Sequence, residues 1–342
     1  MKKLTIGGRD IRPGTRVKIE LPVVKLYTDT GVVMPIYVIR SKHDGPTVFV
    51  SAAVHGDEIN GVEIIRRIIK SKSFRLQKGT LILVPIVNPY GLLNQSRYMP
   101  DRRDLNRTFP GSPKGSLAGR VADRFLAEIV DHCEYGIDLH TGAIHRSNLP
   151  QIRANLDDQE TRALACAFGV PVLLNANIRD GSLRQAAVDL GTKVLLYEAG
   201  EALRFDELSI RAGVKGITNV LTFLGMLKAR KNHKHSDFNP FISNHSSWVR
   251  AGSSGIVSSL RSLGDSVTEG DVLAEIGSPF GEILSVVKAT KSGIVIGQQN
   301  IPLVQEGDAM YHIAYFSEDD ELIAEDIERL QDELLPDDDQ GQ

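Results

Sequence analysis

Two histidines and a glutamate stand in short motifs whose residue types suit metal-assisted chemistry. His55 and Glu58 occur in the run HGDE, and His140 occurs in DLHTG. Two imidazoles and one carboxylate form the protein ligand set of many catalytic zinc sites, in which a fourth position stays open for water. His55, Glu58 and His140 are therefore predicted to bind one Zn²⁺ per chain. The alternative is a pair of structural histidines, because the HxxE spacing alone occurs in many chains without a metal.

Two further carboxylates are placed to assist such a metal. Asp138 precedes His140 by two residues, so both side chains would point to one side of a strand, and Asp138 could orient the imidazole as an acceptor. Glu198 lies in the run YEAGE after an apolar stretch, where a carboxylate could be the general base for a water molecule. A turn carboxylate is the alternative for Glu198, and we assign that plainer role to Glu201.

An arginine-rich segment, residues 88–111 (NPYGLLNQSRYMPDRRDLNRTFPG), is too long and irregular for an ordinary connection. Arginine binds carboxylates through two parallel N–H donors and can polarise a carbonyl group. The segment is therefore predicted to be a functional loop. The alternative is a solvated cluster of Arg–Asp pairs, to which we assign Arg102 and Arg103.

The elements that must position these residues alternate along the chain. The predicted strands are residues 47–54, 80–87, 135–139, 170–174 and 193–197, preceded by a β-hairpin over 16–40. The predicted helices are residues 58–71, 117–130, 157–168, 182–190 and 207–229. Such alternation indicates a layered α/β/α domain with a mixed, largely parallel sheet. His55, His140 and Glu198 each follow a predicted strand, and the carboxyl edge of a parallel sheet is where such folds carry their sites.

The domain organisation is predicted from changes in composition and residue pattern along the chain. Residues 1–230 are predicted to form the α/β domain, and the polar, turn-rich residues 231–247 a linker. Residues 248–316 have short β-rich pieces between glycine turns, which indicates a small all-β domain. Residues 317–342 are predicted to form an acidic tail helix with one apolar stripe that docks it.

Composition limits the class of protein and its location. With 42% hydrophobic and 24% charged residues, the chain suits a globular fold. Two cysteines cannot build a disulfide framework, and no apolar run has the length of a membrane span, so we expect a cytoplasmic protein without a membrane partner. The net charge of −3 divides into −11 for residues 317–342 and +8 for the remainder. A positive body with few aromatic residues favours small anionic carboxylates over nucleic acid as partners.

Taken together, five motifs resemble the succinylglutamate desuccinylase/aspartoacylase family of the zinc carboxypeptidase-like superfamily. They are HGDE (55–58), NPxG (88–91), R…DLNRxFPG (97–111), DLHTG (138–142) and YEAGE (197–201), in order over roughly the first 230 residues. The resemblance implies zinc on His55, Glu58 and His140, with Glu198 as general base and then acid. It also implies that Arg97 polarises the scissile carbonyl.

The same resemblance implies three residues for the substrate carboxylate. Asn106 and Arg107 would bind it, and Arg184 resembles the second carboxylate-binding arginine of the family. Asp180 stands where aspartoacylases have a tyrosine, which argues against an aspartoacylase specifically. The sequence leaves open whether His145 and Arg153 line the cleft.

The C-terminal β region resembles a biotinyl/lipoyl-like barrel-sandwich hybrid, in which GDSVTEGDVLAEI is the typical turn–strand pattern. A carrier domain of that kind needs a lysine at the tip of its exposed hairpin. The corresponding tip, residues 277–281, reads GSPFG and has none. We therefore expect this region to border the cleft or mediate assembly, without a covalently attached cofactor.

The function that the sequence favours is zinc-dependent hydrolysis of the amide bond of an N-acyl amino acid or similar small carboxylate. The alternatives are a carboxypeptidase-like hydrolase acting on peptides or amino-acid tails, and a non-catalytic zinc-binding scaffold. The acyl group, the amino acid and the oligomeric state are open, and an exposed β edge would allow a homo-oligomer.

Overall fold

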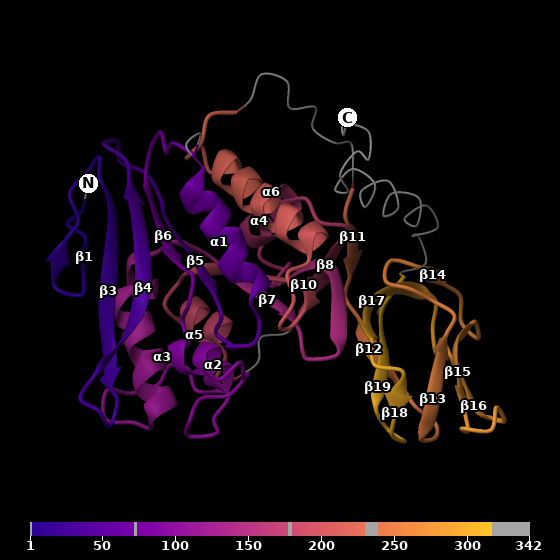
Figure 1. The fold of residues 1–342 in the computed structure, drawn as a ribbon. Helices are drawn as coiled ribbons and strands as arrows, with labels where there is room; N and C mark the ends of the chain where they lie inside the picture. The colour runs from indigo at the N-terminus through magenta and orange to yellow at the C-terminus, as the bar shows by residue number, and fades with distance from the viewer. Residues whose placement is uncertain (1, 72–73, 177–179, 230–238, 317–342) are drawn as a thin grey trace, which may run out of the picture.

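Four neighbouring parallel strands form the centre of the molecule (Figure 1). They are, in sheet order, β6 (Thr80–Val84), β5 (Thr47–Ala52), β7 (Tyr135–Gly142) and β10 (Lys193–Glu201). The computed structural model describes residues 2–71, 74–176, 180–229 and 239–316. The predicted tail helix over 317–342 lies outside these described residues. Within them, no helix is long and apolar enough to cross a membrane.

Antiparallel strands extend the central block at its N-terminal side. The predicted hairpin is confirmed as β3 (Arg16–Lys25) and β4 (Gly31–Arg40), and β4 pairs antiparallel with β6. A short ribbon, β1 (Thr5–Ile6) with β2 (Arg9–Asp10), precedes it. The alternating apolar residues of β3 and β4 bury one face of this hairpin, as expected for an antiparallel edge.

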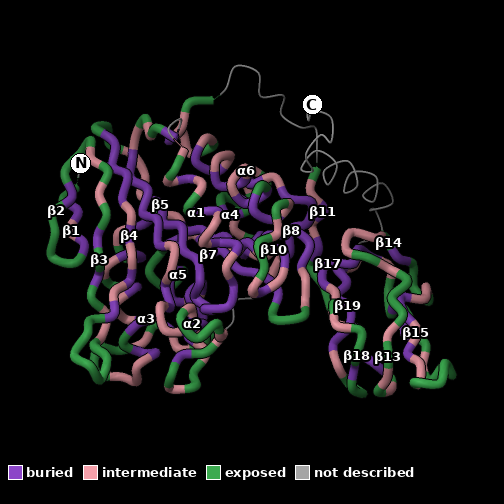
Figure 2. The backbone as a smooth tube through the Cα atoms, viewed as in Figure 1, coloured by how far each residue is buried: buried purple, intermediate pink, exposed green. Residues whose placement is uncertain are grey.

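Helices cover both faces of the sheet, which confirms the predicted α/β/α layers (Figures 1 and 2). One layer contains α1 (Asn60–Lys70), α4 (Gln159–Phe168) and α6 (Glu207–Phe223). The other contains α2 (Pro89–Leu93), α3 (Leu117–Glu128) and α5 (Leu183–Asp189), with the 3-10 turns η1 (Leu105–Arg107) and η2 (Val130–His132) nearby in the chain. Each layer packs an apolar stripe onto one face of the strands, and the two resulting hydrophobic clusters fix the positions of the strand ends.

A strand that was not predicted, β8 (Arg146–Ala154), borders β10 on the side away from β7. Its pairing with β10 shifts register, because Glu198 is opposite Gln151 whereas Gly200 is opposite Asn148. Such a bulge inserts an extra residue and re-aims the side chains that follow. Beyond β8, β9 (Val172–Asn175) runs parallel to it, and β11 (Phe241–Ser243) runs parallel to β9.

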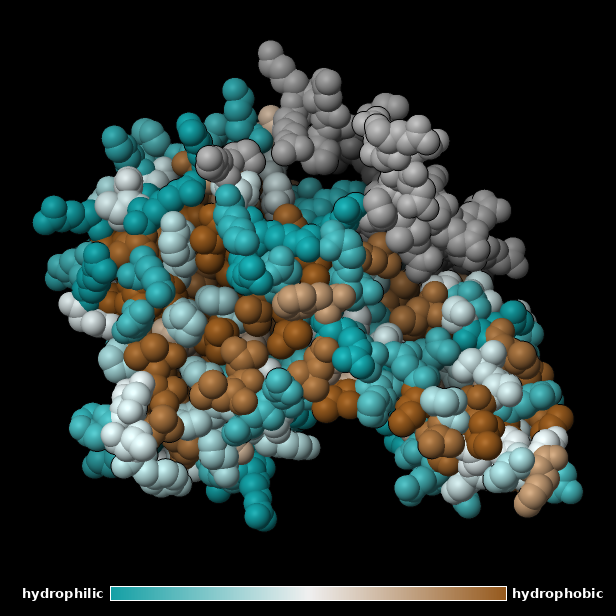
Figure 3. Space-filling view, in the orientation of Figure 1, coloured by the Kyte–Doolittle hydropathy of each residue, from teal (hydrophilic) through white to brown (hydrophobic). Residues whose placement is uncertain are grey.

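The C-terminal β region continues the same sheet. Its strands are β12 (Ser246–Arg250), β13 (Gly255–Ser259), β14 (Ser266–Val267), β15 (Val272–Gly277), β16 (Ile283–Lys288), β17 (Gly293–Gln299), β18 (Leu303–Val304) and β19 (Ala309–Tyr315). Strand β17 pairs antiparallel with β8, so the order β12-β19-β17-β8 joins this region to the central block. Strands β16-β15-β13-β18 form a second, antiparallel sheet. A notch separates the lower part of this region from the main body (Figure 3).

Several boundaries differ from prediction. Strands β7 and β10 continue to Gly142 and Glu201, so His140 and Glu198 lie inside the strands and not after them. Helix α6 ends at Phe223 and not at residue 229, because Gly225 takes a left-handed φ of 67° directly after the last turn. Part of the predicted linker is also in strands, namely β11 and the start of β12. The domain boundaries themselves stay predictions.

Candidate active site

The HGDE turn begins where β5 ends, and it is held by the NPxG run. Gly56 lies so close to α2 that a Cβ there would be 1.8 Å from the carbonyl carbon of Gly91, so only glycine fits. The buried side chain of Asn88 accepts a hydrogen bond from the Gly91 N–H (2.8 Å) and donates one to the Val54 carbonyl (3.3 Å). The two motifs therefore form one structural unit, and it orients His55.

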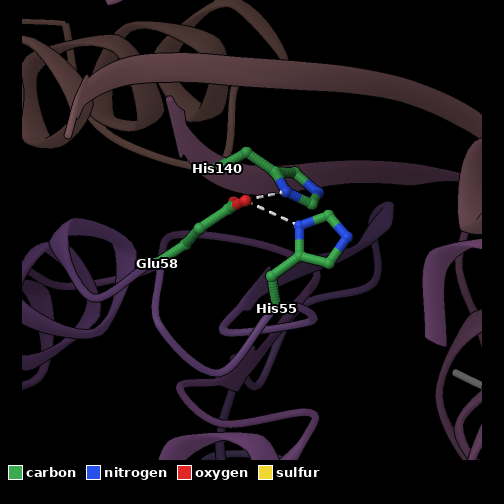
Figure 4. A group of neighbouring side chains, drawn as sticks. All are labelled: His55, Glu58 and His140. Atoms are coloured by element: carbon green, nitrogen blue, oxygen red, sulfur yellow. Dashed lines mark hydrogen bonds and ion pairs between the residues drawn. The ribbon is translucent and has the colours of Figure 1, made fainter. Parts of the chain in front are cut away.

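His55, Glu58 and His140 converge on one point (Figure 4). The Nδ1 atoms of His55 and His140 are each 2.7 Å from a carboxylate oxygen of Glu58, His55 from Oε1 and His140 from Oε2. One ligand atom from each of the three residues lies within 4.8 Å of the others, and all three side chains are buried. The backbone N–H of Thr141 also donates to Glu58 Oε2, at 3.1 Å.

Each imidazole has a second carboxylate at its other ring nitrogen. The Nε2 atom of His140 is 2.8 Å from Asp138, whose other oxygen accepts a hydrogen bond from the Ser51 hydroxyl at 2.7 Å. Asp138 therefore makes the contact predicted for it. The Nε2 atom of His55 is 3.1 Å from Asp104, a residue whose part in the site the sequence did not reveal.

This arrangement needs positive charge at the Nδ1 atoms. A neutral imidazole has only one N–H, yet both nitrogens of His55 and of His140 face carboxylate oxygens. Burial would lower the pKa of each imidazole, but the carboxylates outweigh it, so the pKa of His55 is raised and that of His140 is raised strongly. Burial would likewise raise the pKa of Glu58, but the two imidazoles hold it far below its ordinary value.

A divalent cation would supply the same charge as the two Nδ1 protons. With Nε2–H of each ring donating to aspartate, both Nδ1 lone pairs would point at the ion together with the Glu58 carboxylate. His55, Glu58 and His140 could therefore hold one metal ion, as their spacing in the sequence suggested.

Arg97 reaches the same point from the arginine-rich segment. Its Nη1 atom is 3.3 Å from Glu58 Oε1 and 3.2 Å from His55 Nδ1, while Nε and Nη2 donate to Asp104 at 3.2 and 2.9 Å. Burial would lower the pKa of this guanidinium, but the carboxylates of Glu58 and Asp104 raise it. Arg97 is thus a fixed cation whose Nη1 end borders the candidate metal position.

The three residues predicted for a substrate carboxylate lie together on one wall of the cavity. The side-chain oxygen of Asn106 accepts a hydrogen bond from the Leu183 N–H at the start of α5, at 2.9 Å. The Nη1 atom of Arg107 donates to the backbone carbonyl of Asn106 at 2.6 Å, and Arg184 follows Leu183 in α5. The 88–111 segment and α5 are therefore docked on each other, which brings residues from separate motifs to one wall.

Glu198 lies beside the candidate metal ligands. Strands β7 and β10 pair it with His140, and it lines the same cavity. Its Oε2 atom accepts a hydrogen bond from Asn148 at 2.7 Å and forms an ion pair with Arg153 at 3.3 Å. Arg153 therefore lines the cavity, whereas the exposed side chain of His145 lies 3.9 Å from Glu201 and is not among the lining residues.

The cavity has a volume of about 760 Å³ and receives residues from both parts of the fold. Trp248 and Ser246 of β12 line it, as does Arg146 at the start of β8. Among the described residues, five arginines but only two acidic residues line it: Arg97, Arg107, Arg146, Arg153 and Arg184, against Glu58 and Glu198. Such a cavity suits a small anion.

Two curated proteins are similar to this chain in sequence. An N-alpha-acetyl-L-2,4-diaminobutyric acid deacetylase from Halomonas elongata is 27% identical over 308 residues, covering 86% of this chain and 90% of that protein. A succinylglutamate desuccinylase from Pseudomonas aeruginosa is 27% identical over 157 residues, covering 43% of this chain and 46% of that protein.

Solved structures share the fold over most of the chain. The product-bound ectoine utilization protein EutE (DoeB) from Ruegeria pomeroyi superposes with a TM-score of 0.79 at 25% identity, covering 89% of this chain and 96% of that chain. A succinylglutamate desuccinylase from a Silicibacter species gives 0.77 at 26% identity, covering 90% and 96%. The profile of the succinylglutamate desuccinylase/aspartoacylase catalytic domain matches residues 44–224. By this match, this fold and these motifs, the chain belongs to the succinylglutamate desuccinylase/aspartoacylase family.

Proposed function

We propose that this chain is a zinc-dependent deacylase that hydrolyses the amide bond of an N-acyl amino acid. The observation that carries the proposal is the convergence of the His55, Glu58 and His140 donor atoms beside Glu198 in an arginine-rich cavity. Relatives that act as an N-acetyl-diaminobutyrate deacetylase and as succinylglutamate desuccinylases support the same reaction class. Their acyl groups differ, so the acyl group of this chain's substrate is a separate question.

The metal ligands would be His55, Glu58 and His140, with Asp138 and Asp104 fixing the two imidazoles. Nitrogen and carboxylate donors of this kind suit Zn²⁺. When bound, the ion supplies Lewis-acid polarisation of a carbonyl group and lowers the pKa of a bound water. The aspartates would keep each Nδ1 lone pair free for the ion, because their oxygens accept hydrogen bonds from the Nε2–H groups.

Glu198 would carry protons between water and the leaving amine. As general base it takes a proton from the water that attacks the amide carbon, and as general acid it returns a proton to the departing nitrogen. The C–N bond then breaks to give a carboxylate and a free amine. Asn148 and Arg153, at 2.7 and 3.3 Å, hold the carboxylate of Glu198 toward the cavity through one oxygen, Oε2.

The arginines and Asn106 would orient the substrate and stabilise charge. Arg97 has its Nη1 end at the candidate metal position, where it can donate to the carbonyl oxygen as that atom gains negative charge. Asn106, Arg107 and Arg184 would bind the carboxylate of the amino acid and so keep the amide beside Glu198. The partner is then a small anionic molecule and not a nucleic acid. Cys133 and Cys166 are both free thiols, which supports a cytoplasmic location.

Metal analysis and a substrate screen test the proposal. The purified chain should contain one zinc, and a panel of N-acyl amino acids should include at least one that it hydrolyses. Glu198→Gln should keep the zinc but lower kcat on the order of 10³-fold, because the acid–base group is lost. Glu269→Gln, a change at an exposed position outside the cavity, is the matched control. Near-normal turnover in Glu198→Gln would remove that residue from the mechanism, and a zinc-free active chain would refute the metal.

A further inference from the structure

Arg146 differs from its neighbouring arginines in the cavity. Arg97 is bound to Asp104 and Glu58, and Arg153 is paired with Glu198. Among the described residues, the guanidinium of Arg146 lies over the ring of Trp248, whose centroid is 5.2 Å from its Cζ atom. Its N–H donors are therefore not spent on a carboxylate of the described chain.

The ring that carries Arg146 is itself fixed. Trp248 lies on β12 and stacks on the buried His312 of β19, with ring centroids 4.7 Å apart and an interplanar angle of 11°. The His312 Nε2 atom is 3.0 Å from the Ser246 hydroxyl, which belongs to the same strand as the tryptophan. A guanidinium on an aromatic face keeps the N–H donors of its edge free for a planar acceptor.

Asn300 fixes the residues on both sides of Arg146 in the chain. The backbone N–H of Asn300 donates to the His145 carbonyl at 2.7 Å, and its side-chain amide donates to the Ser147 hydroxyl at 2.6 Å and to Glu201 at 2.8 Å. Glu201 also accepts from the His145 N–H at 3.0 Å. Arg146 is thus clamped two residues before Asn148, the residue that contacts Glu198.

We propose that Arg146, stacked on Trp248, binds a second carboxylate of the substrate. This deepens the proposed function, because it presumes that Asn106, Arg107 and Arg184 take the first carboxylate. A guanidinium fork binds a carboxylate through two parallel hydrogen bonds, and the excess of arginines over acidic residues in the cavity favours more than one negative charge. The second carboxylate can belong to the acyl group or to the amino-acid side chain.

Kinetics with three substrates test the subsite. N-acetylalanine has one carboxylate, N-acetylglutamate has a second one in its side chain, and N-succinylalanine has a second one in its acyl group. The wild type should prefer one of the dicarboxylates, and Arg146→Gln should lower kcat/KM for it roughly 10- to 100-fold. Hydrolysis of N-acetylalanine should change less than about twofold, because it makes no hydrogen bond to Arg146. An equal loss on all three substrates would overturn the proposal.

Arg250→Gln is the matched control, since Arg250 is exposed on the same strand as Trp248 and lies outside the lining of the cavity. It should behave as wild type on all three substrates. Far-UV circular dichroism and the melting temperature establish that each variant is folded. Arg146→Lys keeps the charge without the fork and should recover only part of the preference for the dicarboxylate.

Fluorescence gives a reading that does not depend on turnover, because Trp248 is the only tryptophan in the sequence. Glutarate should change the emission of the zinc-loaded wild type in a saturable way, whereas butyrate should change it far less. Arg146→Gln should lose the glutarate response. An emission that ignores glutarate would overturn the subsite even if deacylation is found. A glutarate response in a chain that hydrolyses no N-acyl amino acid would instead refute the proposed function while supporting the subsite.

Discussion

The two ends of the cavity, the His55–Glu58–His140 cluster and the Arg146–Trp248 pair, differ in how their charged groups are partnered. At the candidate metal end, His55, Glu58 and His140 are at least 96% buried, and both nitrogens of each imidazole are bound to a carboxylate. At the other end, the half-buried Arg146 rests on an aromatic ring and has no carboxylate partner among residues 2–316 that the structure describes. The three donors of the first end could hold one cation. The second end leaves the N–H donors of Arg146 available for a ligand.

The difference implies that damage at the two ends should have different consequences. A change at the metal end removes charge balance that no neighbour can replace. By our proposal, a change at the Arg146 end should remove selectivity but leave the other residues of the cavity in place. Measurements of metal content, turnover and KM separate these two outcomes.

The strongest effect is expected from His140→Ala. One of the three donors disappears, and Glu58 loses one of its two imidazole partners, so the chain should no longer hold stoichiometric metal. Turnover should fall by several orders of magnitude. Elemental analysis and steady-state kinetics measure both losses. His145→Ala is the control, because that side chain is exposed and does not line the cavity. If His140→Ala kept its zinc, the assignment of the metal ligands would be wrong.

A smaller effect concerns pH and the metal-free protein. Carboxylates raise the pKa of both His55 and His140 against the opposing effect of burial. A raised pKa stabilises the fold fully below the pKa of the unfolded chain, about 6.5 for histidine, and that contribution is lost as pH rises through the folded pKa.

The melting temperature of the metal-free protein should therefore decrease when pH is raised from about 6 to 9, relative to the zinc-loaded protein. In the loaded protein the ion takes the place of the protons, so the decrease should be absent. Below about pH 4 a different group lowers the stability of the metal-free protein. The lowered pKa of Glu58 stabilises the fold only above the pKa of the unfolded chain, and this contribution is lost as pH falls. Parallel melting curves for the two forms between pH 6 and 9 would contradict the charge-balance argument.

The weakest effect is expected from Asn300→Ala, at the clamp on the Arg146 end. Loss of the contacts to Ser147 and Glu201 should loosen the turn that carries Arg146. Because Asn300 is exposed, we expect KM for the preferred substrate to rise only about twofold to threefold, with kcat unchanged. Steady-state kinetics measure the split, with Gln305→Ala, another exposed position of the β region, as control. A fall in kcat would show that the clamp also positions Glu198.

The same contrast explains how far the sequence could predict the site. His55, Glu58 and His140 stand in short motifs beside predicted strands, so their convergence and the contact of Asp138 could be anticipated, while metal binding there stays a prediction. Asp104 could not, because its role depends on the fold of the 88–111 segment, where it had the appearance of one more surface charge.

No local pattern in the sequence predicts the Arg146 end of the cavity. Strand β8 reads RSNLPQIRA, and Pro150 with its polar neighbours does not fit the pattern of an inner strand. In the fold the proline lies at the register shift between Asn148 and Gln151, where no ladder hydrogen bond is needed. The contact between Arg146 and Trp248 joins segments far apart in the chain, so no spacing in the sequence could reveal it.

The pairing of β8 with β17 also determines when the fold can be completed during synthesis of the chain. The candidate metal ligands are all present once residue 140 has emerged, but β17, which pairs with Arg146–Asn148 at the start of β8, ends only at Gln299. At ribosomal speeds of about 5–20 residues per second, this short edge would stay unpaired for roughly ten to thirty seconds, whereas β9 covers Gln151–Ala154 much earlier. Exposed edges invite pairing with other chains, so shortened forms that end before β17 should aggregate during expression. The C-terminal region would then protect the start of β8 against misassembly, as well as bordering the cavity.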